Sequence, residues 1–180
     1  MSVQKRLLRW ELAGFIFTSA VGTLLQFLFR WTGKNTLVAA FSAVNESTWE
    51  HMKLLFVPFF VFAMVEYTVF CEPLRNFFAV KAASALTGLL AIPVLFYTLN
   101  GALGKTPDWA NIAIFFVSTA AAYAAGYLLL RSFALRGTML QIIGFAVLWL
   151  LMLAFVYFTY HTPELPLFLD PVTGQYGIPK

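Results

Sequence analysis

The chain has 180 residues, of which 61% are hydrophobic and only 11% are charged. Soluble domains carry about 25% charged residues, so this composition indicates that lipid is the solvent for most of the surface. The formal net charge is +4, but the basic residues form no run or stripe, which argues against nucleic acid as a partner. The single cysteine, Cys71, excludes an internal disulfide and a cysteine-based metal cluster.

Five apolar stretches are long enough to cross a bilayer, which takes about 20 helical residues. We expect these transmembrane helices at about residues 12–29, 54–71, 77–99, 109–130 and 140–160. The apolar segment 37–44 lies before the second span and is too short to cross, so it is expected to be interfacial or re-entrant. The sequence therefore predicts an all-α membrane bundle of five helices that forms a single domain, 1–180.

Lysine and arginine set the expected orientation, because cytoplasmic loops of membrane proteins are enriched in them. With the N-terminus inside, seven of these residues fall on the inner side and five on the outer side. Lys5, Arg6 and Arg9 precede an apolar run that is too long for a cleaved signal peptide. We therefore expect a multi-pass protein of the cell membrane, with a cytoplasmic N-terminus and a C-terminus outside.

The densest polar stretch is 45–53, which reads Asn-Glu-Ser-Thr-Trp-Glu-His-Met-Lys. Ser47 and Glu50 match a capping box at a helix start, and Glu50 and Lys53 are spaced as a surface ion pair. In a regular helix His51 would lie beside Ser47, on a different side from the two glutamates. That helix would place five side chains on one stripe, namely Asn45, Glu46, Trp49, Glu50 and Lys53.

Capping explains only part of this stretch, and the surplus residues suggest chemistry. Glu46 and Glu50 could share a proton or a cation. Ser47 and His51 could pair as nucleophile and base, but no Gly-x-Ser-x-Gly elbow accompanies them. The spacing fits no zinc motif, so we assign no metal and expect no cofactor. The candidate metal ligands are Glu46, Glu50, His51 and His161.

The C-terminal tail, 161–180, is rich in Leu, Phe, Tyr and Pro and is expected to be ordered. Asp170 followed by Pro171 favours a turn. With five spans the tail lies on the same side of the membrane as the stretch 45–53, so we expect it to cover that face. The expected ligand-binding residues are Asn45, Glu46, Trp49, Glu50, His51, Lys53, Asp170 and Tyr176.

Two charged residues lie inside expected spans. Glu66 falls near the inner end of the second span and Lys81 near the start of the third. Antiparallel neighbours place them at similar depth, so we predict an ion pair between them. The alternative is that Lys81 extends to the inner headgroups while Glu66 is neutral.

Small residues recur at intervals of four in two of the expected spans, a pattern that lets membrane helices approach closely. Close packing within the bundle is the usual reason. A homodimer, or a partner membrane subunit, is an open alternative, and the lipid bilayer is the expected environment. The residues are Gly14, Thr18 and Gly22 in the first span, and Ser118, Ala122 and Gly126 in the fourth.

Two motifs stand out together. Residues 45–51 read Asn-Glu-Ser-x-Trp-Glu-His, and residues 165–177 read Leu-Pro-Leu-Phe-x-Asp-Pro-x-Thr-Gly-x-Tyr-Gly. In both motifs the chain resembles a bacterial family of small polytopic membrane proteins classed as a domain of unknown function. The resemblance implies a protein of the bacterial cytoplasmic membrane, and it assigns no activity, substrate or cofactor.

The sequence leaves three functions open. We expect a protein that binds or transports a small polar or cationic ligand through a polar site on the outer face. The alternative is a membrane-embedded enzyme, metal-dependent or metal-free, that acts on a lipid-linked substrate, with Glu46 or Glu50 as general base. A non-catalytic membrane factor, whose motifs only fold the outer face, is the third.

Overall fold

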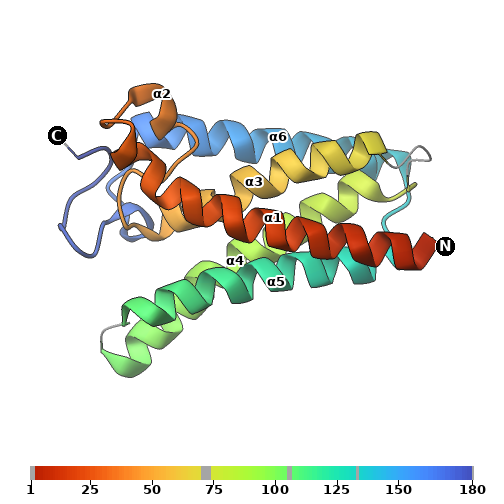
Figure 1. Cartoon of the computed structure of the whole chain (residues 1–180), viewed down its shortest axis with the longest axis horizontal. Helices are drawn as coiled ribbons and strands as arrows, with labels where there is room; N and C mark the ends of the chain where they lie inside the picture. The colour runs from red at the N-terminus through yellow and green to blue at the C-terminus, as the bar shows by residue number, and fades with distance from the viewer. Residues whose placement is uncertain (1–2, 70–73, 105–106, 133, 180) are drawn as a thin grey trace.

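The computed structural model describes residues 3–69, 74–104, 107–132 and 134–179. Within these ranges the chain forms six α-helices and no strand, which confirms the all-α class (Figure 1). In chain order the elements are α1 Val3–Trp31, α2 Thr36–Ala39, α3 Thr48–Val69, α4 Phe77–Leu103, α5 Asp108–Arg131, α6 Thr138–Tyr160 and a 3-10 turn at Pro166–Phe168.

Five of the described helices are long and apolar enough to cross a membrane, namely α1, α3, α4, α5 and α6. This confirms the expected five-span bundle. The second span starts earlier than expected, because α3 begins at Thr48 and includes part of the polar stretch 45–53. Residues 70–71, at the expected end of that span, lie outside the described residues.

Helix α3 lies at the centre and packs on α1, α4 and α6 (Figure 1). Its large apolar side chains, such as Leu55, Phe56 and Phe59, are buried, and α3 contributes more residues to the main core cluster than any other helix. Helix α6 lies at the periphery, where Ile142 and Leu150 are exposed. A wide apolar surface of this kind is expected where helices face lipid.

The small residues of α1 and α5 serve packing within the chain. A methyl group at Gly14 would meet the rings of Phe62 and Tyr123 at less than 3.0 Å. At Gly22 a methyl group would meet the ring of Phe115 at 2.7 Å. Glycine is therefore required at both positions, because any larger side chain would push α1 away from its neighbours.

The segment before α3 is short and well packed. Helix α2 is a single turn, and its N-cap Asn35 accepts hydrogen bonds from the backbone N–H groups of Leu37 and Val38. Behind it, Ala39 and Val44 pack against Phe29 at the end of α1. As expected, this segment does not cross the bundle.

The tail folds back over the same end of the bundle. Leu169 and Tyr176 form an isolated antiparallel bridge, and Phe168 is buried against α3. We call this the motif end of the bundle, and the N-terminus lies at the opposite end (Figure 1). Towards the motif end, α4 and α5 diverge from the other helices (Figure 1).

Candidate functional site

The start of α3 separates residues that a continuous helix would have aligned. The side chain of Asn45 accepts from the N–H of Ser47, and the hydroxyl of Ser47 accepts from the N–H of Glu50. The helix therefore begins at Thr48, and Asn45 and Glu46 precede it. The expected single stripe of five side chains is wrong for this reason.

Glu50 and Lys53 point into the bundle and pair with each other. Their charged atoms lie 2.7 Å apart, and the two side chains are 4% and 0% exposed. The ammonium also donates to the carbonyl of Ala39 and the hydroxyl of Thr159, both at 2.9 Å. The glutamate accepts the N–H of Val44 instead of reaching back to Ser47. The expected surface pair is thus a buried pair, and the expected capping box is only half formed.

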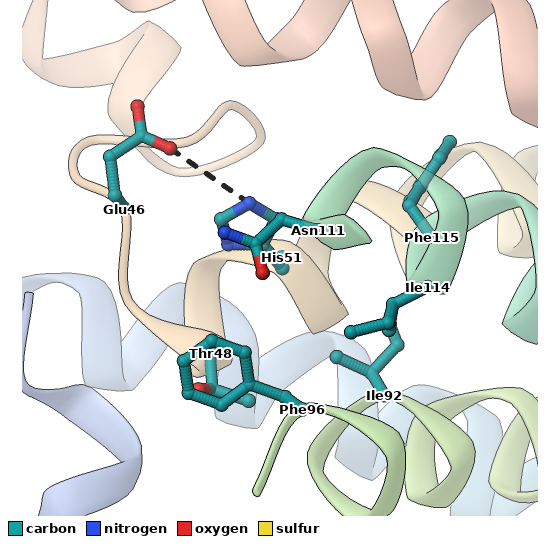
Figure 2. Close-up of a pocket in the computed structure, with 8 residues that line it drawn as sticks. All are labelled: Glu46, Thr48, His51, Ile92, Phe96, Asn111, Ile114 and Phe115. Carbon is teal, nitrogen blue, oxygen red and sulfur yellow. Dashed lines mark ion pairs between the residues drawn. The ribbon is translucent and has the colours of Figure 1, made fainter. Parts of the chain in front are cut away.

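Glu46 turns the other way, towards α1. Its two carboxylate oxygens each accept from the Gln26 amide at 2.9 Å, and one lies 3.3 Å from the guanidinium of Arg30. The other lies 3.8 Å from Nε2 of His51 (Figure 2). His51 was expected to point away from the glutamates, but the break in the helix before Thr48 brings it next to Glu46.

The ring of His51 is held in one orientation. Its Nδ1 lies 2.9 Å from the carbonyl oxygen of Ser47, which can only accept a hydrogen bond. Nδ1 therefore carries the proton, and in the neutral ring Nε2 is left as an acceptor that faces Glu46. The hydrogen bond from Nδ1 to the carbonyl one helical turn earlier thus fixes the orientation of the imidazole.

Glu46 and His51 lie at the end of a cavity of about 500 Å³ between α1 and α5. We call it the crevice. Most of its walls are apolar and its motif end is polar, and the turn of the tail closes one edge. Its lining residues are Gly22, Thr23, Gln26, Phe27, Arg30, Glu46, His51, Leu54, Asn111, Ile112, Phe115, Phe116, Pro171 and Val172.

A second, smaller cavity adjoins the crevice. Its volume is about 20 Å³, which is room for about one water molecule. Glu46, His51, Asn111 and Phe115 line both cavities, and Figure 2 shows the side chains of Glu46, His51 and Asn111 gathered from the α3 region and α5.

Two amide oxygens beside the crevice lack a hydrogen-bond donor among the described residues. They are Oε1 of Gln26 and Oδ1 of Asn111, and both are buried. The Gln26 assignment is fixed by its neighbour, because its nitrogen is the atom that donates to Glu46. Buried carbonyl oxygens are usually paired. Two acceptor oxygens of crevice-lining residues are therefore left without a partner by the described residues.

The other residues expected to bind a ligand have structural contacts. Trp49 packs between the rings of Phe155 and Phe168, with centroids 4.5 and 4.7 Å away. Asn45 donates to the carbonyl of Gly177 in the tail. Together these contacts hold the tail against the motif end.

Some tail residues stabilise the fold of the tail, and others line the crevice. The Asp170 carboxylate accepts from the N–H of Val172 and the hydroxyl of Thr173 and stabilises the expected turn. Tyr176 lies in the bridge with Leu169, and neither Asp170 nor Tyr176 lines the crevice. Pro171 and Val172, which were not among the expected ligand-binding residues, line it instead.

The candidate metal ligands do not converge. Glu46 and His51 are neighbours, but Glu50 is paired with Lys53 inside the bundle. His161 ends α6, where it stacks on Tyr157 with ring centroids 4.5 Å apart. Among the described residues, no three His, Cys, Asp or Glu side chains are placed to hold a metal ion.

At the opposite end, Lys81 lies 2.6 Å from the carboxylate of Glu66, the partner expected from the sequence. It also lies 2.7 Å from the carboxylate of Glu11 on α1. The sequence did not indicate Glu11, because the expected first span started at residue 12, one position after it. The sequence signal that could have indicated Glu11 is that a carboxylate lies within the long helix α1.

Taken together, these features define a multi-pass helical membrane protein with a polar-ended lateral cavity and buried charge clusters. The chain belongs to a family of unknown function, DUF6512, whose family model matches residues 1–178. Searches of curated proteins and of solved structures found no match. The family assigns no activity, so a function has to be inferred from the site.

Proposed function

We propose that this protein binds an amphipathic ligand whose head carries ammonium or hydroxyl donors. The head would lie at the polar end of the crevice, and the apolar part between α1 and α5. We place the protein in the bacterial cytoplasmic membrane with the motif end outside, in line with the basic residues before the first span. The ligand would then enter sideways from the outer leaflet.

The acceptors gathered at the polar end of the crevice are the observation that carries the proposal. Glu46 supplies a carboxylate that is 30% exposed, and Nε2 of His51 faces this carboxylate from 3.8 Å. The buried Oε1 of Gln26 and Oδ1 of Asn111 have no hydrogen-bond partner among the described residues, and both residues line the same crevice. A head with several N–H or O–H donors would satisfy these groups, whereas an anionic head would meet the carboxylate unfavourably.

The position of Arg30 favours a ligand head that also carries an anionic group. Its side chain is 68% exposed at the rim, 3.3 Å from Glu46, so it can contact a second group without leaving its present place. A guanidinium suits a phosphate. A head with both an ammonium and a phosphate, like that of phosphatidylethanolamine, matches the pair of charges at the crevice.

Lipid competition tests this directly. The full chain, purified in mild detergent, is offered equal amounts of phosphatidylethanolamine and phosphatidylcholine with the same acyl chains, and bound lipid is counted by native mass spectrometry. Both lipids carry the same net charge, but only the first has N–H donors. We expect about tenfold preference for phosphatidylethanolamine, which corresponds to about 1.4 kcal/mol, the scale of one good hydrogen bond to a charged group.

The Glu46→Gln variant should lose most of this preference, and Asn111→Leu part of it. Glu164→Gln is the matched control, because Glu164 is an exposed tail carboxylate that does not line the crevice. Equal binding of both lipids by the wild type would overturn the proposal, as would a preference that Glu46→Gln leaves intact.

The orientation of His51 favours one alternative, an enzyme acting on a lipid-linked substrate. An imidazole tethered through Nδ1 and beside a carboxylate can act as a general base. In this case His51→Ala would retain lipid binding but lose turnover, measured as headgroup release from liposomes. If wild-type protein leaves every offered headgroup intact, binding is the function that stands.

A further inference from the structure

Lys81 lies between two carboxylates deep in the bundle, far from the crevice. Its ammonium is 2.7 Å from Glu11 on α1 and 2.6 Å from Glu66 on α3, and all three side chains are at most 3% exposed. We call these residues the triad. Fifteen helical residues separate Glu11 from Gln26, which is about 22 Å along α1, so the triad and the crevice are separate sites.

The surroundings of the triad are mostly apolar. The ammonium of Lys81 lies 5.6–5.9 Å from the ring centroids of Phe59, Phe77 and Tyr123. The only other titratable group facing it in the described residues is Tyr123, whose hydroxyl is hydrogen-bonded to Thr18 at 2.7 Å. Among the described residues, Lys81 is the cation that pairs with these two carboxylates.

The triad has neither a balanced charge nor a full set of hydrogen bonds. With both glutamates ionised, its net charge is −1 in an apolar interior, where an uncompensated charge is strongly unfavourable. Oε2 of Glu11 and Oε1 of Glu66 are buried and have no hydrogen-bond partner among the described residues. A single cation of charge +1, small enough to fit between the existing atoms, would neutralise the cluster and give a carboxyl oxygen a partner.

We propose that the triad is a proton-binding site, in which one proton sits on a free carboxyl oxygen of Glu11 or Glu66. Binding takes one H⁺ from water and forms one O–H bond, which leaves the cluster neutral. A metal ion would need several more oxygen ligands, and the described residues offer no such set. The protein would thus carry an exchangeable proton between α1, α3 and α4. Loss of this proton would leave an uncompensated charge between these three helices and would disturb their packing.

Infrared spectroscopy of the full chain in nanodiscs tests for this proton, since a protonated carboxyl has a C=O stretch distinct from that of a carboxylate. At about pH 7, where exposed glutamates are ionised, we expect a band for one buried carboxyl. Glu11→Gln and Glu66→Gln should each abolish it, because the remaining glutamate then pairs one-to-one with Lys81. Glu164→Gln should leave it unchanged.

A second readout needs no spectral assignment. The folded state should hold one more proton than the unfolded state, so the wild-type melting temperature should fall as the pH rises from about 6 to about 9. Either glutamine variant should flatten this part of the profile, and if one fails to fold, the other serves.

Several results would overturn the proposal. One is a wild type without the carboxyl band, and another is a band that survives both glutamine variants. A third is a band that appears only when Na⁺ is replaced by choline, which would make the occupant a metal cation.

Discussion

Among the described residues, buried ion pairs form two clusters, and the two clusters differ in their balance of charge. Near the motif end, one carboxylate meets one ammonium in the pair Glu50–Lys53, and the ammonium has two further acceptors. At the opposite end, Lys81 meets two carboxylates, and an oxygen on each of these lacks a partner. A balanced, fully paired cluster has no capacity for a ligand, whereas an unbalanced one does.

The same distinction applies to the polar stretch 45–53. Glu50 and Lys53 attracted attention as ligand-binding residues, yet they satisfy each other in the core. Glu46 and His51 are half-buried at the crevice, beside amides with unused oxygens. Unsatisfied groups, more than polar ones as such, therefore indicate where this protein can bind something.

The largest effect is expected from Glu50→Gln. It leaves the ammonium of Lys53 buried without a counter-charge, which costs about 3–5 kcal/mol. Chemical unfolding in detergent, followed by tryptophan fluorescence, measures this loss. The double variant Glu50→Gln/Lys53→Met should recover most of it, and failure to recover would show that the pair does more than balance charge.

A methyl group beside the triad should have the next largest effect. In Gly126→Ala the new Cβ would lie 3.0 Å from Oε2 of Glu11 and 3.2 Å from the Ser84 hydroxyl. Crowding of this kind costs about 1–3 kcal/mol. Gly101→Ala is the matched control, since nothing lies within 4 Å of its Cβ, and its melting temperature should not fall.

Thr159→Val tests whether the balanced pair depends on its extra acceptors. The substitution keeps the shape of the side chain but removes one acceptor of the Lys53 ammonium. We expect a loss of about 1–2 kcal/mol in the free energy of unfolding. An unchanged stability would mean that the ammonium finds another acceptor in the bundle.

The smallest effect is expected from Glu11→Gln. If the triad holds a proton, an amide replaces a neutral carboxyl group and Lys81 keeps Glu66 as its counter-charge. The free energy of unfolding at neutral pH should change by less than about 1 kcal/mol. A loss as large as that of Glu50→Gln would show that Lys81 depends on Glu11 as a counter-charge, and would contradict a neutral carboxyl at that position.

Much of the fold was readable from the sequence, because apolar stretches of sufficient length leave few alternatives in lipid. The N-cap of α3 at Ser47 was also indicated by the sequence, and α3 does begin at Thr48. The directions that Glu46 and Glu50 take on either side of this break were not, since they depend on contacts with α1 and with the core. That break decides the site, because it sends Glu46 towards α1 and Glu50 into the core.

The sequence also could not predict which residues contact Glu46. Gln26 and Arg30 come from α1 and Asn111 from α5, and each is an ordinary polar residue in its own segment. Only the packing of the helices shows that they meet Glu46. Glu11 was missed for a similar reason, since its importance rests on Lys81, seventy positions further along the chain.

Photo-crosslinking in nanodiscs tests the central claim, ligand binding in the crevice, most directly. A phosphatidylethanolamine with a photoactivatable acyl chain is incorporated, and modified peptides are identified by mass spectrometry. We expect labelling at Phe27, Ile112 and Phe116 on the crevice walls, and we expect excess phosphatidylethanolamine, but not phosphatidylcholine, to suppress it. Labelling spread evenly to the exposed face of α6, at Ile142 and Leu150, would mean ordinary surrounding lipid and would contradict this claim.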